Sequence, residues 1–316
     1  MARGGGIPPP GSEESTMDNG QSEEVPSATP SRRFRTTVFR VLRVLVVAWA
    51  LMSVLAALFY PHLLYHPDRN KSTLTPATLG VPYEEFWLTA ADGARLHGWF
   101  VPADPAVAKS GTLLVFHGNA GNLATAAHRL ALYSGLGRDV FMIDYHGFGE
   151  SGGKPSEANL YLGAETVWEH LTVTRGVPPG EIVIMGYSLG GAVASWLAER
   201  NPGIAGLVLE STFTRLSDVA SDFFPYLPCR LILGGAYNTL GRLPRIKAPL
   251  LVVHGKGDAL VAFKYGEKIY AEYHGDKSFL LIGNDHNVGF LVERDRYMHG
   301  LGHFFEKVAK GAISEH

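Results

Sequence analysis

The sequence predicts an α/β fold: a mostly parallel eight-stranded sheet with an antiparallel hairpin at its start and helices on both faces. From about Val81 onward, short apolar runs recur, and amphipathic stretches lie between most of the later ones. Near-continuous apolar runs separated by helices are typical of parallel strands that are covered on both faces. The first two runs lie close together and enclose Asp92-Gly93, a dipeptide that favours a hairpin turn.

The expected elements follow one another closely along the chain. The strands are expected at 84–89, 96–101, 112–118, 139–145, 181–187, 205–210, 249–255 and 278–283. The helices are expected at 123–134, 156–171, 189–200, 263–273 and 294–308. Between the sixth and seventh strands, a helix at 215–224 and an apolar stretch broken by prolines predict a small cap insert.

The composition excludes several classes of protein. With 316 residues, of which 46% are hydrophobic and 18% charged, the chain can bury a substantial core. It resembles neither a fully disordered chain nor a protein with many membrane spans. A formal net charge of −2 leaves no basic footprint for nucleic acid. The single cysteine, Cys229, excludes an internal disulfide.

The N-terminal eighty residues are expected to form three parts. Residues 1–31 are rich in Gly, Pro, Ser and Glu, which predicts a disordered tail. Residues 38–60 are predicted to form a transmembrane anchor, because the run is almost wholly apolar and approaches the roughly 20 residues that cross a bilayer. Pro61 is expected to end this helix, and a linker at 61–80 then leads to the folded domain at 81–310.

The apolar run at 38–60 has two other interpretations, a buried core helix and a cleaved signal peptide. A buried core helix would usually keep a polar face, and a cleaved signal peptide would usually follow a shorter N-terminal region, so we favour an uncleaved span. The excess of basic residues before the span favours a single-pass membrane protein with a cytoplasmic N terminus and a non-cytoplasmic folded domain. Those before the span are Arg32, Arg33, Arg35, Arg40 and Arg43, whereas Arg69 and Lys71 follow it.

Ser188 lies in a pattern that is typical of a catalytic nucleophile. Residues 186–190 read Gly-Tyr-Ser-Leu-Gly, a G-x-S-x-G sequence that follows a predicted strand and precedes a predicted helix. This context places the serine on a strained strand-to-helix turn, where flanking glycines avoid collisions with neighbouring backbone. The N terminus of the following helix adds partial positive charge near the hydroxyl.

Ser188 needs a base and an acid, and both follow predicted strands. Asp258 lies after the strand at 249–255, and His286 lies after the strand at 278–283. The chain order Ser188, Asp258, His286 is that of an α/β-hydrolase triad. Asp285 is a rival acid, but adjacent residues in an extended loop point apart. Of the rival bases, His254 lies too close to its strand, and His274 lies before the last predicted strand.

A serine nucleophile also needs two donors for the oxyanion that forms on the substrate. The amide of Leu189, directly after Ser188, is the first candidate. The amide of Asn119 is the second, because it lies in the glycine-containing loop "HGNAGN" after the strand at 112–118. His117 in this loop is expected to be structural.

Several segments of the chain together resemble the α/β-hydrolase superfamily. They are "FHGNAGN", "DYHGFGESGG", "GYSLGG", "LVLESTF", "LLVVHGKGD" and "GNDHN", and they look like those of a membrane-anchored subgroup related to monoacylglycerol lipases and protein depalmitoylases. The resemblance covers about Val81 to Val308 and the N-terminal anchor. It implies an α/β-hydrolase catalytic domain at 81–310, with nucleophile Ser188, acid Asp258 and base His286. Residues 1–31 contain no Cys, unlike the palmitoylated tail of the depalmitoylase members.

The expected function is therefore that of a membrane-anchored serine hydrolase that cleaves carboxylic esters or thioesters through an acyl-enzyme. The cap either packs over the sheet or forms an acyl-chain wall, and its small size favours small or single-chain acyl substrates. No cofactor and no metal are expected, since Gly147-x-Gly149-x-x-Gly152 lacks the helix and acidic residue of a dinucleotide site and no metal-ligand spacing is present. A serine peptidase of the same fold and a non-catalytic membrane-tethered binding domain are the alternatives.

Overall fold

The computed structural model describes residues 32–70, 74–283 and 285–314. The predicted tail at 1–31 lies outside these residues. The chain divides into two compact units, Met1–Ala48 and Trp49–His316. The second unit contains the predicted folded domain and also residues 49–64 of the N-terminal helix.

Helix α1 (Arg32–Leu64) contains the predicted anchor. An 18-residue window within it has a mean hydropathy of 2.4 and none of it is buried, so the helix is long and apolar enough to cross a membrane. The expectation that Pro61 ends this helix is wrong, because the helix continues to Leu64. Proline removes only its own amide donor, and its carbonyl still accepts a hydrogen bond from the amide of Tyr65 at 2.9 Å.

The predicted eight-stranded sheet is confirmed, with the strand order β10-β9-β8-β7-β4-β6-β3-β2. Strand β3 runs antiparallel to β2 and β6, and all other neighbouring pairs are parallel. The strands are β2 (Glu84–Thr89), β3 (Arg95–Val101), β4 (Thr112–Phe116), β6 (Asp139–Ile143), β7 (Ile182–Tyr187), β8 (Gly206–Glu210), β9 (Leu250–Gly255) and β10 (Lys277–Ile282).

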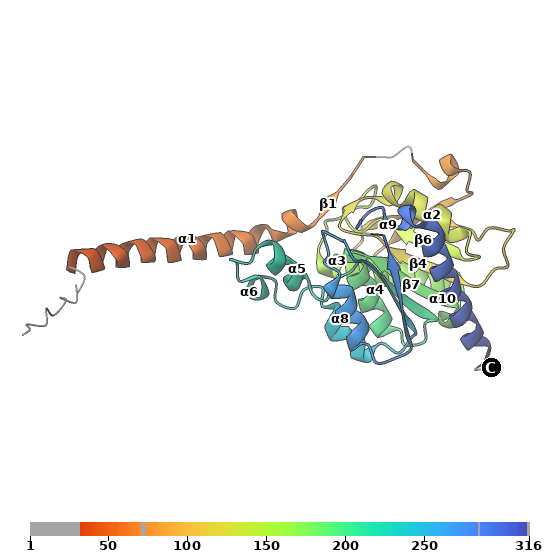
Figure 1. Cartoon of the computed structure of the whole chain (residues 1–316). Coiled ribbons are helices and arrows are strands. Elements are labelled where there is room, and N and C mark those ends of the chain that lie inside the picture. Colours follow the sequence, from red (N-terminus) through yellow and green to blue (C-terminus); the bar gives the residue numbers. More distant parts are fainter. Residues whose placement is uncertain (1–31, 71–73, 284, 315–316) are drawn as a thin grey trace, which may run out of the picture. The chain divides into compact units, whose positions relative to one another are not determined.

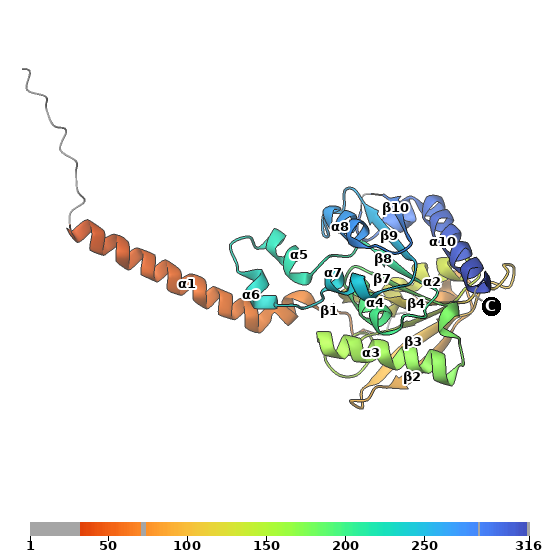
Figure 2. The same ribbon diagram turned by 90° about the horizontal axis from the view of Figure 1, so that it is seen from below.

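Helices cover both faces of this sheet (Figures 1 and 2). Successive side chains of a strand point to opposite faces, so Leu114 and Ile184 belong to one apolar core and Val115 and Val183 to the other. The first core includes residues of α3 (Glu157–Glu169), α4 (Leu189–Arg200) and α8 (Lys264–Glu272). The second includes residues of α2 (Ala127–Ser134) and α10 (Arg294–Ser314).

The small cap lies between β8 and β9. It contains α5 (Leu216–Phe223), which the sequence predicts, and the shorter helices α6 (Cys229–Leu233) and α7 (Thr239–Arg242). Pro225 and Pro228 separate α5 from α6. The cap thus consists of short helices and is small, as expected.

A two-stranded parallel sheet that the sequence does not predict joins the end of α1 to the loop after β4. Strand β1 (His66–Pro67) pairs with β5 (Ala120–Gly121). Part of the segment expected as a linker at 61–80 is thus ordered by hydrogen bonds, and the short 3₁₀ helix η1 (Pro76–Leu79) follows it. This pairing makes the end of α1 part of the second compact unit.

Candidate active site

Ser188 occupies the turn between β7 and α4. Its backbone has φ 53° and ψ −124°, a conformation that residues with a Cβ rarely adopt. The turn needs glycine on both sides: a Cβ at Gly186 would collide with the carbonyl of Gly190, and a Cβ at Gly190 would collide with the carbonyl of Phe116. Backbone strain at a hydroxyl that lines a pocket is typical of a functional position.

Hydrogen bonds to the neighbouring strand β8 hold this turn in place. The amide of Ser188 donates to the carbonyl of Glu210 at 2.9 Å. The hydroxyl of Thr212 donates to the carbonyl of Ser188 at 2.7 Å. The backbone of Ser188 is therefore fixed from both sides, while its side chain lines a pocket.

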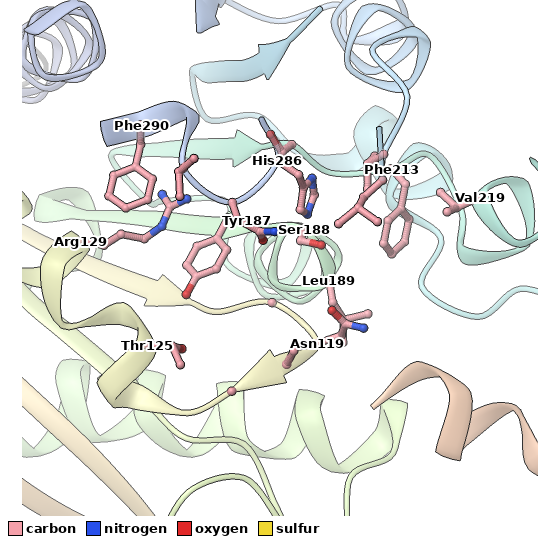
Figure 3. A pocket seen from close by; sticks show the side chains of 18 of the residues that line it. Asn119, Thr125, Arg129, Tyr187, Ser188, Leu189, Phe213, Val219, His286 and Phe290 are labelled. Atoms are coloured by element: carbon pink, nitrogen blue, oxygen red, sulfur yellow. The ribbon is translucent and has the colours of Figure 1, made fainter. Parts of the chain in front are cut away.

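Asp258 and His286 form a hydrogen-bonded pair beside this pocket. The imidazole Nδ1 of His286 donates to Oδ2 of Asp258 at 2.7 Å. The other carboxylate oxygen of Asp258 accepts from the amides of Leu260 and Val261 at 3.0 and 2.8 Å. With Nδ1 engaged in this way, Nε2 of His286 is the nitrogen that can accept a proton. The His286 ring and the Ser188 hydroxyl both line the pocket (Figure 3).

The environment of Asp258 favours its ionised form. Burial alone would raise the pKa of this carboxyl, but the hydrogen bond and the charge of His286, with the amide of Val261, together lower the pKa below its ordinary value. An ionised Asp258 can orient the His286 ring and stabilise an imidazolium.

The rival residues make other contacts. Asp285 accepts hydrogen bonds from the amides of Asn287 and Val288 at 2.7 and 3.0 Å, so it orders the loop that carries His286. His254 is buried and hydrogen-bonded to the carbonyl of Val261. His274 is exposed after α8 and is not among the pocket-lining residues.

Both predicted oxyanion donors line the same pocket. Leu189 is the first residue of α4, and the first amides of an α-helix have no carbonyl partner within the helix. Asn119 lies directly before β5. The adjacent Gly118 is so near Ser188 that a Cβ there would lie 3.5 Å from the Ser188 Cβ. The backbone of the loop after β4 therefore lies beside the hydroxyl.

The segment that follows α1, residues 64–70, holds this loop; we call it the strap. The side chain of Asn119 donates to the carbonyl of Leu64 at 2.6 Å, and the amide of His66 donates to the carbonyl of Asn119 at 2.9 Å. The amide of Asp68 donates to the carbonyl of Gly121 at 3.0 Å. The conformation of Asn119 therefore depends on the strap.

The pocket has a volume of about 630 Å³ and is lined mainly by apolar side chains. That volume is in the range of sites that hold small ligands. The cap supplies part of the apolar wall, through Phe213, Leu216, Val219 and Phe223.

Residues 111–243 match a family model described as the alpha/beta hydrolase fold. The alpha/beta hydrolase domain-containing protein WAV2 of Arabidopsis thaliana is 34% identical over 227 residues, which cover 65% of this chain and 72% of that protein. The chain belongs to the α/β-hydrolase family. Protein bem46 of Schizosaccharomyces pombe is 31% identical over 249 residues, covering 72% of this chain and 80% of that protein.

Solved structures show the same α/β-hydrolase fold. The Pyrococcus furiosus esterase Pf2001 matches with a TM-score of 0.63 at 21% identity, over 77% of this chain and 98% of that one. A hydrolase from Vibrio vulnificus matches with a TM-score of 0.61 at 20% identity, over 77% and 88%. At this identity the likeness concerns the fold alone.

This α/β-hydrolase has a buried ion pair behind the pocket that the sequence analysis missed. Arg129 of α2 lies 2.7 Å from Oε1 of Glu210, and both side chains are buried. The hydroxyl of Tyr297 donates to the other oxygen of Glu210 at 2.6 Å. A charged residue inside the apolar helix sequence "AHRLALYS", and another at the end of an apolar strand, are the signals that could have revealed the pair.

Arg129 also connects the serine turn to the histidine loop. Its guanidinium lies over the ring of Tyr187, 4.4 Å from the centroid, and over the ring of Phe290, at 3.7 Å. Tyr187 precedes Ser188, and Phe290 follows His286 by four residues. The cation thus packs between the two parts of the site that carry the candidate nucleophile and base (Figure 3).

Other polar groups near the site are structural in their contacts. His117 is buried, its Nδ1 donates to the carbonyl of Gly118, and burial lowers its pKa to about 4. Asp144 is buried and accepts from the amide of Leu123, and burial raises its pKa to about 8. Gly147 and Gly149 both have positive φ and shape the loop after β6. No group of three potential metal ligands occurs within 32–70, 74–283 and 285–314.

Proposed function

We propose that this protein is a membrane-anchored serine hydrolase that cleaves carboxylic esters or thioesters through an acyl-enzyme. The observation that carries the proposal is the hydrogen-bonded pair of His286 and Asp258 in a pocket that Ser188 also lines. An alcohol, an imidazole and a carboxylate in this order are the groups that acyl transfer needs. Membership of the α/β-hydrolase family and the esterase fold of Pf2001 support the same reaction class.

In the first half-reaction, Nε2 of His286 takes the proton of the Ser188 hydroxyl as its oxygen attacks the carbonyl carbon of the ester. The amides of Leu189 and Asn119 donate to the oxyanion of the tetrahedral intermediate. The carbon–oxygen or carbon–sulfur bond to the leaving group then breaks, and His286 donates its proton to the departing alcohol or thiol.

In the second half-reaction, water replaces the leaving group. His286 takes a proton from this water, whose oxygen attacks the acyl carbon of the ester formed on Ser188. Collapse of the second intermediate breaks the bond to Ser188, and the serine recovers its proton from His286. The carboxylate of Asp258 stabilises the imidazolium in both halves.

The apolar length of α1 supports a single membrane span, and the arginines at its N-terminal end support a cytoplasmic N terminus with the catalytic domain on the opposite side. In sealed vesicles that expose the cytoplasmic face, added protease should remove the tail and leave the domain intact. Digestion of the domain without detergent would contradict this topology.

Reaction with a fluorophosphonate probe tests the catalytic proposal. The full-length protein should be labelled and should hydrolyse p-nitrophenyl esters, whereas Ser188→Ala should lose labelling and lower kcat by about 10⁵- to 10⁶-fold. Labelling that persists in Ser188→Ala would refute the assignment of the nucleophile. Hydrolysis of peptides but not esters would favour a peptidase, and no reaction at all would favour a binding domain.

A further inference from the structure

The cap exposes large apolar side chains at one place, the turn between α5 and α6, which we call the cap tip (223–231). Phe224, Tyr226 and Leu231 are 41%, 58% and 83% exposed, and Phe223 is 52% exposed. Four such side chains within nine residues form a concentrated apolar surface, and surfaces of this kind usually contact a membrane or another protein.

A hydrogen bond joins the cap tip to the apolar part of α1. The indole Nε1 of Trp49 donates to the backbone carbonyl of Tyr226 at 2.8 Å. Trp49 lies within the uncharged run 44–60 of α1. The bond pairs two groups, an indole N–H and a carbonyl, that would each be costly if left unpaired in hydrocarbon. The cap tip therefore lies beside the segment that is apolar enough to enter a bilayer.

Asp222, which adjoins the cap tip, and Arg230, which lies within it, are both paired with side chains of α8 or α5. Asp222 accepts from Lys264 at 2.8 Å and from the hydroxyl of Tyr265 at 2.7 Å. The guanidinium of Arg230 lies 3.4 Å from Asp218. These pairs reduce the cost of placing the tip against an apolar phase.

The pocket continues to this surface. Phe223 lines the pocket and is also half exposed at the cap tip. Leu64, the last residue of α1, and Val219 of α5 line the pocket as well. The apolar wall thus runs from Ser188 to the elements that adjoin the uncharged run of α1.

We propose that the cap tip inserts into the acyl-chain layer of the bilayer leaflet beside α1, so that the pocket opens toward lipid. Ester substrates then reach Ser188 from the bilayer without crossing water. The second part of this proposal rests on the proposed hydrolase function, whereas insertion of the tip does not. The bilayer is favoured over a protein partner because α1, which adjoins the tip, is itself a candidate span.

Insertion is measured by the fluorescence of a label at position 231, in full-length protein carrying Cys229→Ser and Leu231→Cys, in phosphatidylcholine vesicles. Lipids brominated on their acyl chains should quench the label strongly. A label at Val173, which is 74% exposed in the turn after α3, serves as the control and should not be quenched. An unquenched label at position 231 would overturn insertion, as would disulfide-linked dimers formed by the same protein before it is labelled.

The substrate route is measured with Phe224→Ser/Leu231→Ser, two exposed residues that do not line the pocket. This variant should hydrolyse soluble p-nitrophenyl acetate within about twofold of the unaltered protein. It should be at least tenfold slower on a long-chain ester dissolved in vesicles, whereas Val173→Ser should match the unaltered protein on both substrates. Equal rates on the vesicle ester would overturn the route. Absence of hydrolysis in the unaltered protein would contradict the hydrolase proposal, and quenching would still decide insertion.

Discussion

The two sides of the pocket are built differently. On the serine side, Ser188 follows a central strand, and its position is defined mainly by the backbone: by a main-chain hydrogen bond to β8 and close packing at two glycines, with one further hydrogen bond from the hydroxyl of Thr212. On the histidine side, His286 follows the edge strand β10 and is positioned by side chains, through Asp258 and through the contact of Arg129 with Phe290. The comparison teaches that substitutions of side chains should damage the histidine side more than the serine side.

Among the variants that keep Ser188, Asp258→Asn should have the largest effect on activity, because an amide cannot hold His286 in the tautomer that leaves Nε2 free. We expect kcat on a soluble ester to fall by roughly 10³- to 10⁴-fold with little change in KM. Asp285→Asn is the matched control, since within the described residues the Asp285 side chain is hydrogen-bonded to backbone amides of its own loop and not to His286. A similar loss in both variants would mean that the loop, and not the carboxylate of Asp258, is what matters.

Arg129→Met tests whether side chains couple the two sides. It leaves the carboxylate of Glu210 buried without its cation, so the free energy of unfolding should fall by about 3 to 5 kcal/mol in urea titrations. The double variant Arg129→Met/Glu210→Gln removes the unpaired charge and should recover most of this stability. Its kcat should nonetheless stay about tenfold low, because the contact with Phe290 is still lost. Full recovery of kcat would make the pair purely structural.

His66→Pro tests the strap against the oxyanion loop. Proline removes the amide that donates to the carbonyl of Asn119, and we expect kcat to fall by about tenfold, equivalent to one hydrogen bond of about 1.4 kcal/mol. His66→Ala removes the imidazole but keeps this amide, and it should retain kcat. Equal behaviour of the two variants would show that the strap does not position the loop.

The smallest expected effect is a difference in stability between Ser188→Gly and Ser188→Ala. Glycine adopts φ 53° readily, so this variant should be about 1 kcal/mol more stable to urea than Ser188→Ala, which keeps a Cβ. Both variants should be inactive. No difference between them would indicate that the turn at Ser188 is relaxed.

The sequence predicted the features that depend on local patterns. Most strands of the main sheet are apolar runs bounded by turn residues, and the fold class is confirmed. Ser188 could be found because its glycines are adjacent to it, and Asp258 and His286 because each follows a strand. Their catalytic roles stay predictions, although the hydrogen bond between Asp258 and His286 agrees with them.

Other features depend on contacts between distant residues and have weak local signals. A strand of two residues such as β1 has no periodicity, so its pairing with β5 could not be predicted. Arg129 and Glu210 are far apart in the chain, and only their apolar surroundings marked them. Pro61 misled the prediction because a helix can lose one donor and continue.

The strap also limits how far the folded domain can move from the end of α1. A domain joined to its membrane segment by a long flexible linker could occupy positions at many distances from its attachment point, and this range would grow with the length of the linker. Here the chain is hydrogen-bonded to the loop after β4 within a few residues of the end of α1. With α1 held in a membrane, the folded domain would stay close to the bilayer surface. Under the proposed function, its ester substrates would therefore have to reach it there.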